Sequence, residues 1–340
     1  MQKKISWIGL ALDLAGILQV NAQDAKQDST YKRWFVGSKF LMAILLSLLQ
    51  ITSFAQQKVI PLYSGEIPNS KKTPANYKEN LDTNGLFTQI SIPTLTVYTP
   101  KKGTENGTAV IILGSGGYRV LVDEGGDFAR AFISKGITTF VLKYRLPSDE
   151  IMKDKSTGPL QDAQMAIKLV RMNAKEYNVD TNKIGFVGVS AGGHLASTEA
   201  THLNTVLIDN QEKINLRPDF MILVYPVISF TQAKVSATIT KLLGANPDEY
   251  SLIYFSNEKH VTANTPPTFL LHANDDLRVP VQHSLLFYEA LQKAKVKSEF
   301  HILQSGGHGF ALEHETRGDK WFSWCIDWLD ENGFGIQAKK

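Results

Sequence analysis

The chain has 340 residues and a formal net charge of +3, and 43% of its residues are hydrophobic while 20% are charged. This composition is that of an ordinary globular protein, and it excludes a disordered chain, a collagen and a disulfide scaffold. Cys325 is the single cysteine, so the chain can form no internal disulfide and no cysteine-based zinc site.

Residues 1–55 have the layout of a targeting segment. Three basic residues precede an apolar run over residues 40–49, which is shorter than the roughly 20 residues of a membrane span. Ser53 and Ala55 supply the small residues of a cleavage site. We therefore expect a signal peptide cleaved after Ala55, with export to the periplasm or secretion, and an uncleaved N-terminal anchor is the alternative.

A second signal-like stretch over residues 1–22 indicates that the true translation start lies downstream of the assigned one. Residues 1–55 hold six of the basic and three of the acidic side chains, so residues 56–340 carry 30 of each. A mature chain without net charge has no overall field to attract nucleic acid or an anionic membrane. We expect neither partner, and no stable membrane span after processing; the sequence does not indicate an oligomeric state.

Short apolar or β-branched runs alternate with stretches of helical period over the rest of the chain. The expected strands are residues 94–98, 109–113, 138–144, 183–189, 220–225, 268–272 and 299–303. The expected helices are residues 126–135, 159–177, 191–203, 281–294 and 319–331. Strands that are apolar on both faces and alternate with helices predict an α/β fold, with a mainly parallel central sheet covered on both sides. We expect one domain over residues 56–340, with small helices capping it around residues 229–266.

The sequence G-V-S-A-G at residues 188–192 lies between an expected strand and an expected helix. This is the setting of a nucleophile elbow, in which a serine sits on a tight turn and its neighbours must lack bulk. Gly188 and Gly192 meet that need, and the helix that follows offers its first N–H groups to developing negative charge. We therefore expect Ser190 to be a nucleophile; the alternative is a glycine-rich turn with a purely structural role.

A serine hydroxyl needs a base, and the base needs an acid that fixes its tautomer. His308, in G-G-H-G-F after the last expected strand, is the best placed histidine for the base. Asp276 is favoured as the acid because it follows a strand and precedes V-P, and neighbouring Asp275 remains an alternative. The order serine, aspartate, histidine along the chain is that of the α/β-hydrolase fold.

An oxyanion hole should combine the N–H of Ala191 with an N–H from the loop after an early strand. Gly116 and Gly117, in L-G-S-G-G-Y after the strand 109–113, fit that loop. The pattern matches neither a dinucleotide-binding loop nor a P-loop. His and carboxylate residues do not cluster at ligand spacing, so we expect no metal and no cofactor.

These motifs resemble those of the secreted bacterial esterase/lipase-like α/β hydrolases that are related to acetylxylan esterases and often labelled as xylanases. The matching stretches are G-S-G-G-Y at 114–118, F-V-L-K-Y-R-L-P at 140–147, P-L-Q-D-A-Q at 159–164, G-V-S-A-G-G-H-L-A-S at 188–197, R-P-D-F at 217–220, D-D-L-R-V-P at 275–280 and G-G-H-G-F at 306–310. Relatives usually show three consecutive glycines before the tyrosine, whereas Ser115 takes the first place here.

The resemblance implies Ser190 as nucleophile, Asp276 as acid and His308 as base, with Gly116 or Gly117 and Ala191 as oxyanion donors. It further implies a serine carboxylesterase that removes acetyl or other short acyl groups from a small-molecule or carbohydrate ester such as acetylated xylan. Glycoside cleavage is disfavoured because no pair of carboxylates is evident. A serine peptidase of the prolyl-oligopeptidase type and a non-catalytic binding protein that keeps the fold are the alternatives.

Overall fold

The computed structural model describes residues 57–232, 235–310, 312 and 318–335. Residues 1–55, with the expected signal peptide and its cleavage site after Ala55, lie outside the described residues. None of the helices in the described ranges is long and apolar enough to cross a bilayer.

The strands of the main sheet are β1 (Gln57–Pro61), β4 (Thr94–Tyr98), β5 (Ala109–Leu113), β7 (Thr138–Lys143), β8 (Ile184–Val189), β9 (Met221–Val224), β10 (Thr268–Ala273) and β11 (Ser298–Leu303). A small second sheet contains β2 (Asn80–Leu81), β3 (Leu86–Thr88) and β6 (Leu121–Val122). The helices are α3 (Gly125–Ile133), α4 (Gly158–Met172), α5 (Ala191–Thr201), α6 (Ser236–Leu243), α7 (Glu249–Tyr254), η1 (Asn257–His260), α8 (Gln282–Lys293) and α9 (Gly318–Glu331).

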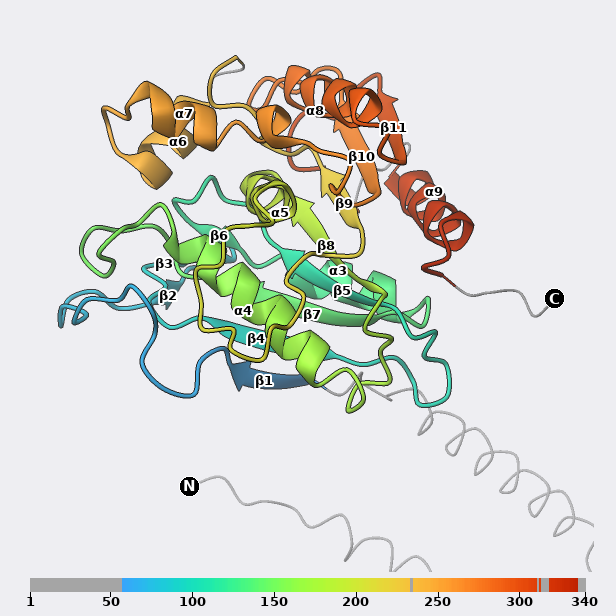
Figure 1. The fold of residues 1–340 in the computed structure, drawn as a ribbon, viewed down its shortest axis with the longest axis horizontal. Helices are drawn as coiled ribbons and strands as arrows, with labels where there is room; N and C mark the ends of the chain where they lie inside the picture. The colour runs from blue at the N-terminus through green and yellow to red at the C-terminus, as the bar shows by residue number, and fades with distance from the viewer. Residues whose placement is uncertain (1–56, 233–234, 311, 313–317, 336–340) are drawn as a thin grey trace, which may run out of the picture. The chain divides into compact units, whose positions relative to one another are not determined.

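The main sheet has the strand order β1-β4-β7-β5-β8-β9-β10-β11 (Figure 1). All neighbours from β7 to β11 pair in parallel, and β4 pairs antiparallel with both β1 and β7. The predicted mainly parallel sheet of an α/β-hydrolase fold is therefore confirmed. The antiparallel edge strand β1 was not anticipated from the sequence.

Helices cover both faces of this sheet. Successive side chains of a strand point to opposite sides, so each strand contributes to two separate cores. In β5, Ile111 belongs to the core formed with α4, α5 and α8, whereas Ile112 belongs to the core formed with α3 and α9. Both side chains are fully buried. A strand flanked by two cores needs an unbroken apolar sequence, and A-V-I-I-L supplies it.

One detail departs from the predicted elements. Helix α4 ends at Met172, well before residue 177, and the chain turns between Asn173 and Val179. The connection over residues 229–266 carries α6, α7 and η1, coloured orange in Figure 1, as the expected small helices.

The arrangement of strands decides where chemistry can occur. In a parallel sheet the carboxyl ends of the strands lie along one edge, and ligands bind at that edge. The loops after β5, β8, β10 and β11 hold the predicted oxyanion glycines, Ser190, Asp276 and His308 in turn. Residues from four distant parts of the sequence are thus brought to the same edge.

Candidate active site

Ser190 occupies the sharp turn between β8 and α5. Its backbone has φ 54° and ψ −114°, a conformation that a residue with a side chain rarely adopts. Hydrogen bonds hold the turn: its N–H donates to the Val224 carbonyl at 3.0 Å, and its own carbonyl accepts the N–H groups of Gly193, His194 and Val227. The surrounding structure therefore enforces the strain, and the side chain is only 5% exposed.

Three glycines around Ser190 make this turn possible. A Cβ on Gly188 would lie 2.7 Å from the Gly192 carbonyl oxygen, and one on Gly192 would overlap the carbonyl oxygen of Leu113. A Cβ on Gly193 would lie 2.5 Å from Cβ of Pro226. The sequence motif identifies the first two of these glycines, and the need for the third appears only from the packing of α5 against the segment after β9.

His308 lies within hydrogen-bonding distance of Ser190. Its Nε2 is 2.9 Å from Ser190 Oγ, and its Nδ1 is 2.6 Å from Asp276 Oδ2. A carboxylate accepts hydrogen bonds, so Nδ1 carries the proton and the lone pair of Nε2 faces the serine hydroxyl. The ring of Tyr225 lies 4.7 Å from the imidazole between centroids and forms one wall for it. The structure thus brings together all three residues of the predicted triad in the order required for proton transfer.

Asp276 is buried and fully occupied by hydrogen bonds. Its Oδ1 accepts the N–H groups of Arg278 and Val279, both at 2.9 Å. His272 lies behind it, with Nε2 2.8 Å from the Val279 carbonyl and 3.3 Å from Asp276 Oδ2. Burial raises the pKa of the Asp276 carboxyl, but the hydrogen bonds from His272, His308 and the Val279 amide lower it by more. The carboxyl is therefore ionised at neutral pH.

The alternative acid and the other histidines have different places. Asp275 is exposed and accepts the N–H of Gly307 at 2.8 Å, so it braces the loop that carries the base. His301, on β11, bonds Glu299 and stacks on Trp324. Among the described residues, neither Asp275 nor His301 forms a hydrogen bond with Ser190 or His308, so neither belongs to the triad.

The predicted oxyanion loop follows β5, directly beside the turn of Ser190. Leu113 at the end of β5 pairs with Gly188 of β8, and Gly116 and Gly117 follow with φ values of 130° and 64°. Those positive values favour glycine, and at Gly116 a Cβ would also overlap the carbonyl oxygen of Val120. Within the described part of the chain, no hydrogen bond engages the N–H of Gly116, Gly117 or Ala191. Three backbone donors without partners therefore lie in the loop and at the start of α5, the two places where the sequence predicts the hole.

Glu124 holds the oxyanion loop in place, and its role was not predicted from the sequence. It lies just before α3, and its Oε1 accepts the N–H of Ser115 at 2.7 Å. Burial raises the pKa of this carboxyl, and the hydrogen bond from Ser115 and the charge of His308 lower it only in part. Glu124 therefore fixes Ser115, the residue that stands where relatives usually have a glycine. No signal in the local sequence links these two residues, which are nine positions apart.

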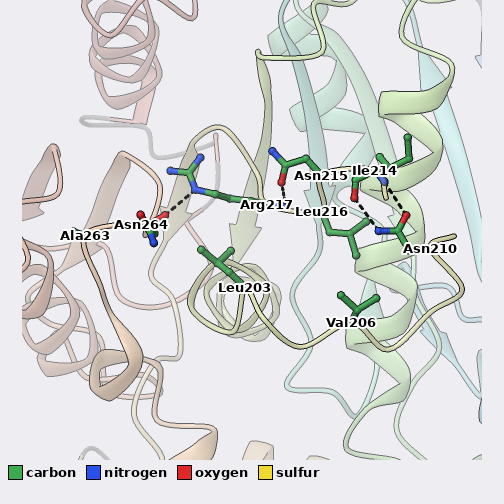
Figure 2. Close-up of a pocket in the computed structure, with 9 residues that line it drawn as sticks. All are labelled: Leu203, Val206, Asn210, Ile214, Asn215, Leu216, Arg217, Ala263 and Asn264. Atoms are coloured by element: carbon green, nitrogen blue, oxygen red, sulfur yellow. Dashed lines mark hydrogen bonds between the residues drawn. The ribbon is translucent and has the colours of Figure 1, made fainter. Parts of the chain in front are cut away.

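A hollow of about 480 Å³ lies elsewhere, next to the C-terminal end of α5 (Figure 2). Its lining residues are Leu203, Val206, Asn210, Ile214, Asn215, Leu216, Arg217, Ala263 and Asn264. Arg217 Nε donates to the Asn264 carbonyl at 2.7 Å, and Asn210 bonds both backbone groups of Ile214. Since the hollow contains none of the triad or oxyanion residues, it is not the site of this chemistry.

The residues that the structure describes contain no group of three or more histidine, cysteine or carboxylate side chains able to hold a metal ion. The chemistry available at the site is that of an activated serine with nearby backbone donors, which is the equipment for acyl transfer.

Comparisons with known proteins agree with this architecture. The sequence profile of the BD-FAE family matches residues 95–291. The crystal structure of the acetyl ester-xyloside bifunctional hydrolase from Caldicellulosiruptor lactoaceticus is similar, with a TM-score of 0.71 and 34% identity, over 83% of this chain and 99% of that one.

Two curated proteins are also similar. Endo-1,4-beta-xylanase B of Butyrivibrio fibrisolvens is 32% identical over 275 residues, which are 78% of this chain and 43% of that protein. Acetylxylan esterase of Xylanibacter ruminicola is 32% identical over 241 residues, which are 68% of this chain and 46% of that protein. The chain spans less than half the length of these two relatives. The predicted resemblance is confirmed, and the chain belongs to the BD-FAE family of α/β hydrolases.

Proposed function

We propose that the protein is a serine carboxylesterase that removes acetyl or other short acyl groups from plant polysaccharides or oligosaccharides such as acetylated xylan. The observation that carries the proposal is the line of contacts from Ser190 Oγ through His308 to Asp276, at 2.9 and 2.6 Å, on a strained elbow. The backbone N–H groups nearby have no hydrogen-bond partner among the residues that the structure describes. The names of similar proteins support an ester on a xylan-type sugar as the substrate.

The geometry defines the first half of the reaction. Ser190 Oγ attacks the ester carbonyl carbon while its proton passes to His308 Nε2, and Asp276 stabilises the imidazolium that forms. The negative charge on the carbonyl oxygen is met by the N–H of Ala191 and by Gly116 or Gly117. When the bond from carbon to the sugar oxygen breaks, His308 returns the proton to that oxygen, and the acyl group stays on Ser190.

The second half repeats these roles with water. A water molecule gives its proton to His308 Nε2 and attacks the acyl carbon, and the bond to Ser190 Oγ then breaks. His308 passes the proton to Oγ, which restores the serine and releases acetate.

Acetate release from acetylated xylan by the purified protein tests the proposal, with Ser190→Ala as the control. The proposal predicts release that is lost in the variant while the fold is retained. Parallel assays use p-nitrophenyl acetate, p-nitrophenyl xyloside and a prolyl peptide. Hydrolysis of the small ester without release from xylan would refute the substrate and leave the mechanism, and retained activity in clean Ser190→Ala protein would refute the mechanism.

The location of the protein is part of the same proposal. A polysaccharide substrate lies outside the cytoplasm, which agrees with export directed by residues 1–55 and cleavage after Ala55. N-terminal sequencing of the protein recovered from its native host should read from Gln56. A mature chain that begins at a residue other than Gln56 would contradict cleavage at this site.

A further inference from the structure

The two parts of the oxyanion hole belong to different elements. Gly116 and Gly117 lie in the loop after β5, whereas Ala191 begins α5. The distance between the donors therefore depends on the contacts that hold the loop against the helix. One such contact joins two side chains. The hydroxyl of Tyr118, which follows Gly117, lies 3.0 Å from Nδ1 of His194, three residues beyond Ala191.

The other nitrogen of His194 determines the direction of this bond. Nε2 lies 2.9 Å from the carbonyl oxygen of Phe255, which can only accept. Nε2 therefore carries the proton, Nδ1 accepts, and the Tyr118 hydroxyl donates. Burial lowers the pKa of His194 to about 4, so the ring stays neutral at neutral pH and keeps this single tautomer.

Packing prevents the imidazole from turning. The ring of Phe230 is stacked on it, with centroids 4.4 Å apart and planes 2° apart, and the ring of Tyr118 meets it edge-on at 5.8 Å. His194 is 0% exposed and Tyr118 is 2% exposed. A side chain stacked on one face by Phe230 and hydrogen-bonded at both nitrogens is held in one position, and it transmits that position to Tyr118.

The backbone of Tyr118 shows why an anchor is needed there. Its φ is 59°, so the left-handed conformation of Gly117 continues into a residue with a bulky side chain. A residue in that region relaxes unless its surroundings hold it. The hydroxyl bond to His194 holds the end of the loop, just as Glu124 holds Ser115 at its start.

We propose that His194 is a positioning residue of the oxyanion hole, which sets the loop donors against Ala191 through the hydroxyl of Tyr118. The inference rests on the proposed esterase function. It also assigns a role to the segment 229–266, which contains both Phe230 and Phe255. The Phe230 ring stacks on the imidazole, and the Phe255 carbonyl accepts its Nε2 proton.

The variant Tyr118→Phe tests the bridge, since it removes one hydroxyl and keeps the buried ring. We expect kcat for p-nitrophenyl acetate to fall roughly tenfold with KM unchanged, because the hole binds the transition state rather than the substrate. The affinity for a trifluoromethyl ketone, whose adduct on Ser190 carries the same oxyanion, should fall by the same factor. His194→Gln should lower kcat and the ketone affinity by a common factor.

The control is Tyr63→Phe, which removes a different hydroxyl, bonded at 3.0 Å to Asp162 and not to a residue of the loop. It should leave kcat and ketone affinity unchanged. An unchanged kcat and ketone affinity in Tyr118→Phe, with only the melting temperature lowered, would reduce the bridge to a structural contact and overturn the inference while the esterase function stands. A wild-type protein that neither hydrolyses esters nor binds the ketone would overturn both.

Discussion

Replacing Asp276 by asparagine should disable His308 as the base, although the two side chains have the same number of heavy atoms. Asp276 Oδ1 is held by two amide donors, those of Arg278 and Val279. In the variant this place must be taken by the amide oxygen, so the NH2 group faces His308. His308 then has to accept at Nδ1 and carries its proton on Nε2. An N–H in place of a lone pair faces the Ser190 hydroxyl, and no base remains.

The expected size of this effect is large. A wrong tautomer in a serine triad costs about 10⁴ in kcat, which corresponds to about 5 kcal/mol of transition-state stabilisation. The assay is kcat for p-nitrophenyl acetate at pH 7, together with the melting temperature. Asp275→Asn is the matched control, since an amide oxygen can still accept the Gly307 N–H, and its kcat should stay within about threefold of the wild-type value. More than a tenth of the wild-type kcat in Asp276→Asn, or an equal loss in Asp275→Asn, would refute the reasoning.

Three further outcomes concern stability and the elbow. Gly192→Ala should abolish esterase activity and lower the yield of folded protein, as judged by circular dichroism, because its Cβ would overlap a carbonyl oxygen at the end of β5; a folded, active variant would contradict this steric account. Arg145→Met should lower stability by about 3–5 kcal/mol in urea unfolding because it leaves the fully buried Asp162 without its partner, whereas Arg130→Met, in an exposed pair, should change it little. The pKa of His194 is about 4 in the folded protein against about 6.5 in the unfolded chain, so the unfolded chain binds the proton first. His194 should therefore contribute about 3 kcal/mol to the fall in unfolding free energy between pH 7.5 and 4, and the fall should be smaller by that amount in His194→Gln; equal slopes would show that this histidine does not contribute to the change.

The parallel strands were predictable to within a residue or two because burial on both faces leaves a continuous apolar run. β1 escaped prediction for the opposite reason. It is an edge strand with exposed Lys58 and Val59, and it ends in Pro61. Its position depends on pairing with β4 and not on any pattern of its own. Helix α4 was predicted too long because the apolar period continues into a turn that places Tyr177 in the core.

The residues of the candidate site also fall into a predicted and an unpredicted group. Ser190, Asp276 and His308 were predicted from local motifs and from their order along the chain, and their positions at one sheet edge follow from the fold. Two of the contacts that support them were not. The bond from Ser115 to Glu124 and the bond from Tyr118 to His194 join different elements of the fold, and such contacts leave no mark in the local sequence.

The central claim is that Ser190 is the nucleophile, activated by His308. Treatment of the protein with a fluorophosphonate probe, followed by digestion and mass spectrometry, tests it most directly, since the probe reports the activated serine whatever the natural ester is. The account predicts one adduct, on the peptide that contains Ser190, with none in Ser190→Ala and labelling slowed by orders of magnitude in His308→Ala. An adduct on another serine, or efficient ester hydrolysis by protein whose Ser190 stays unlabelled, would contradict it.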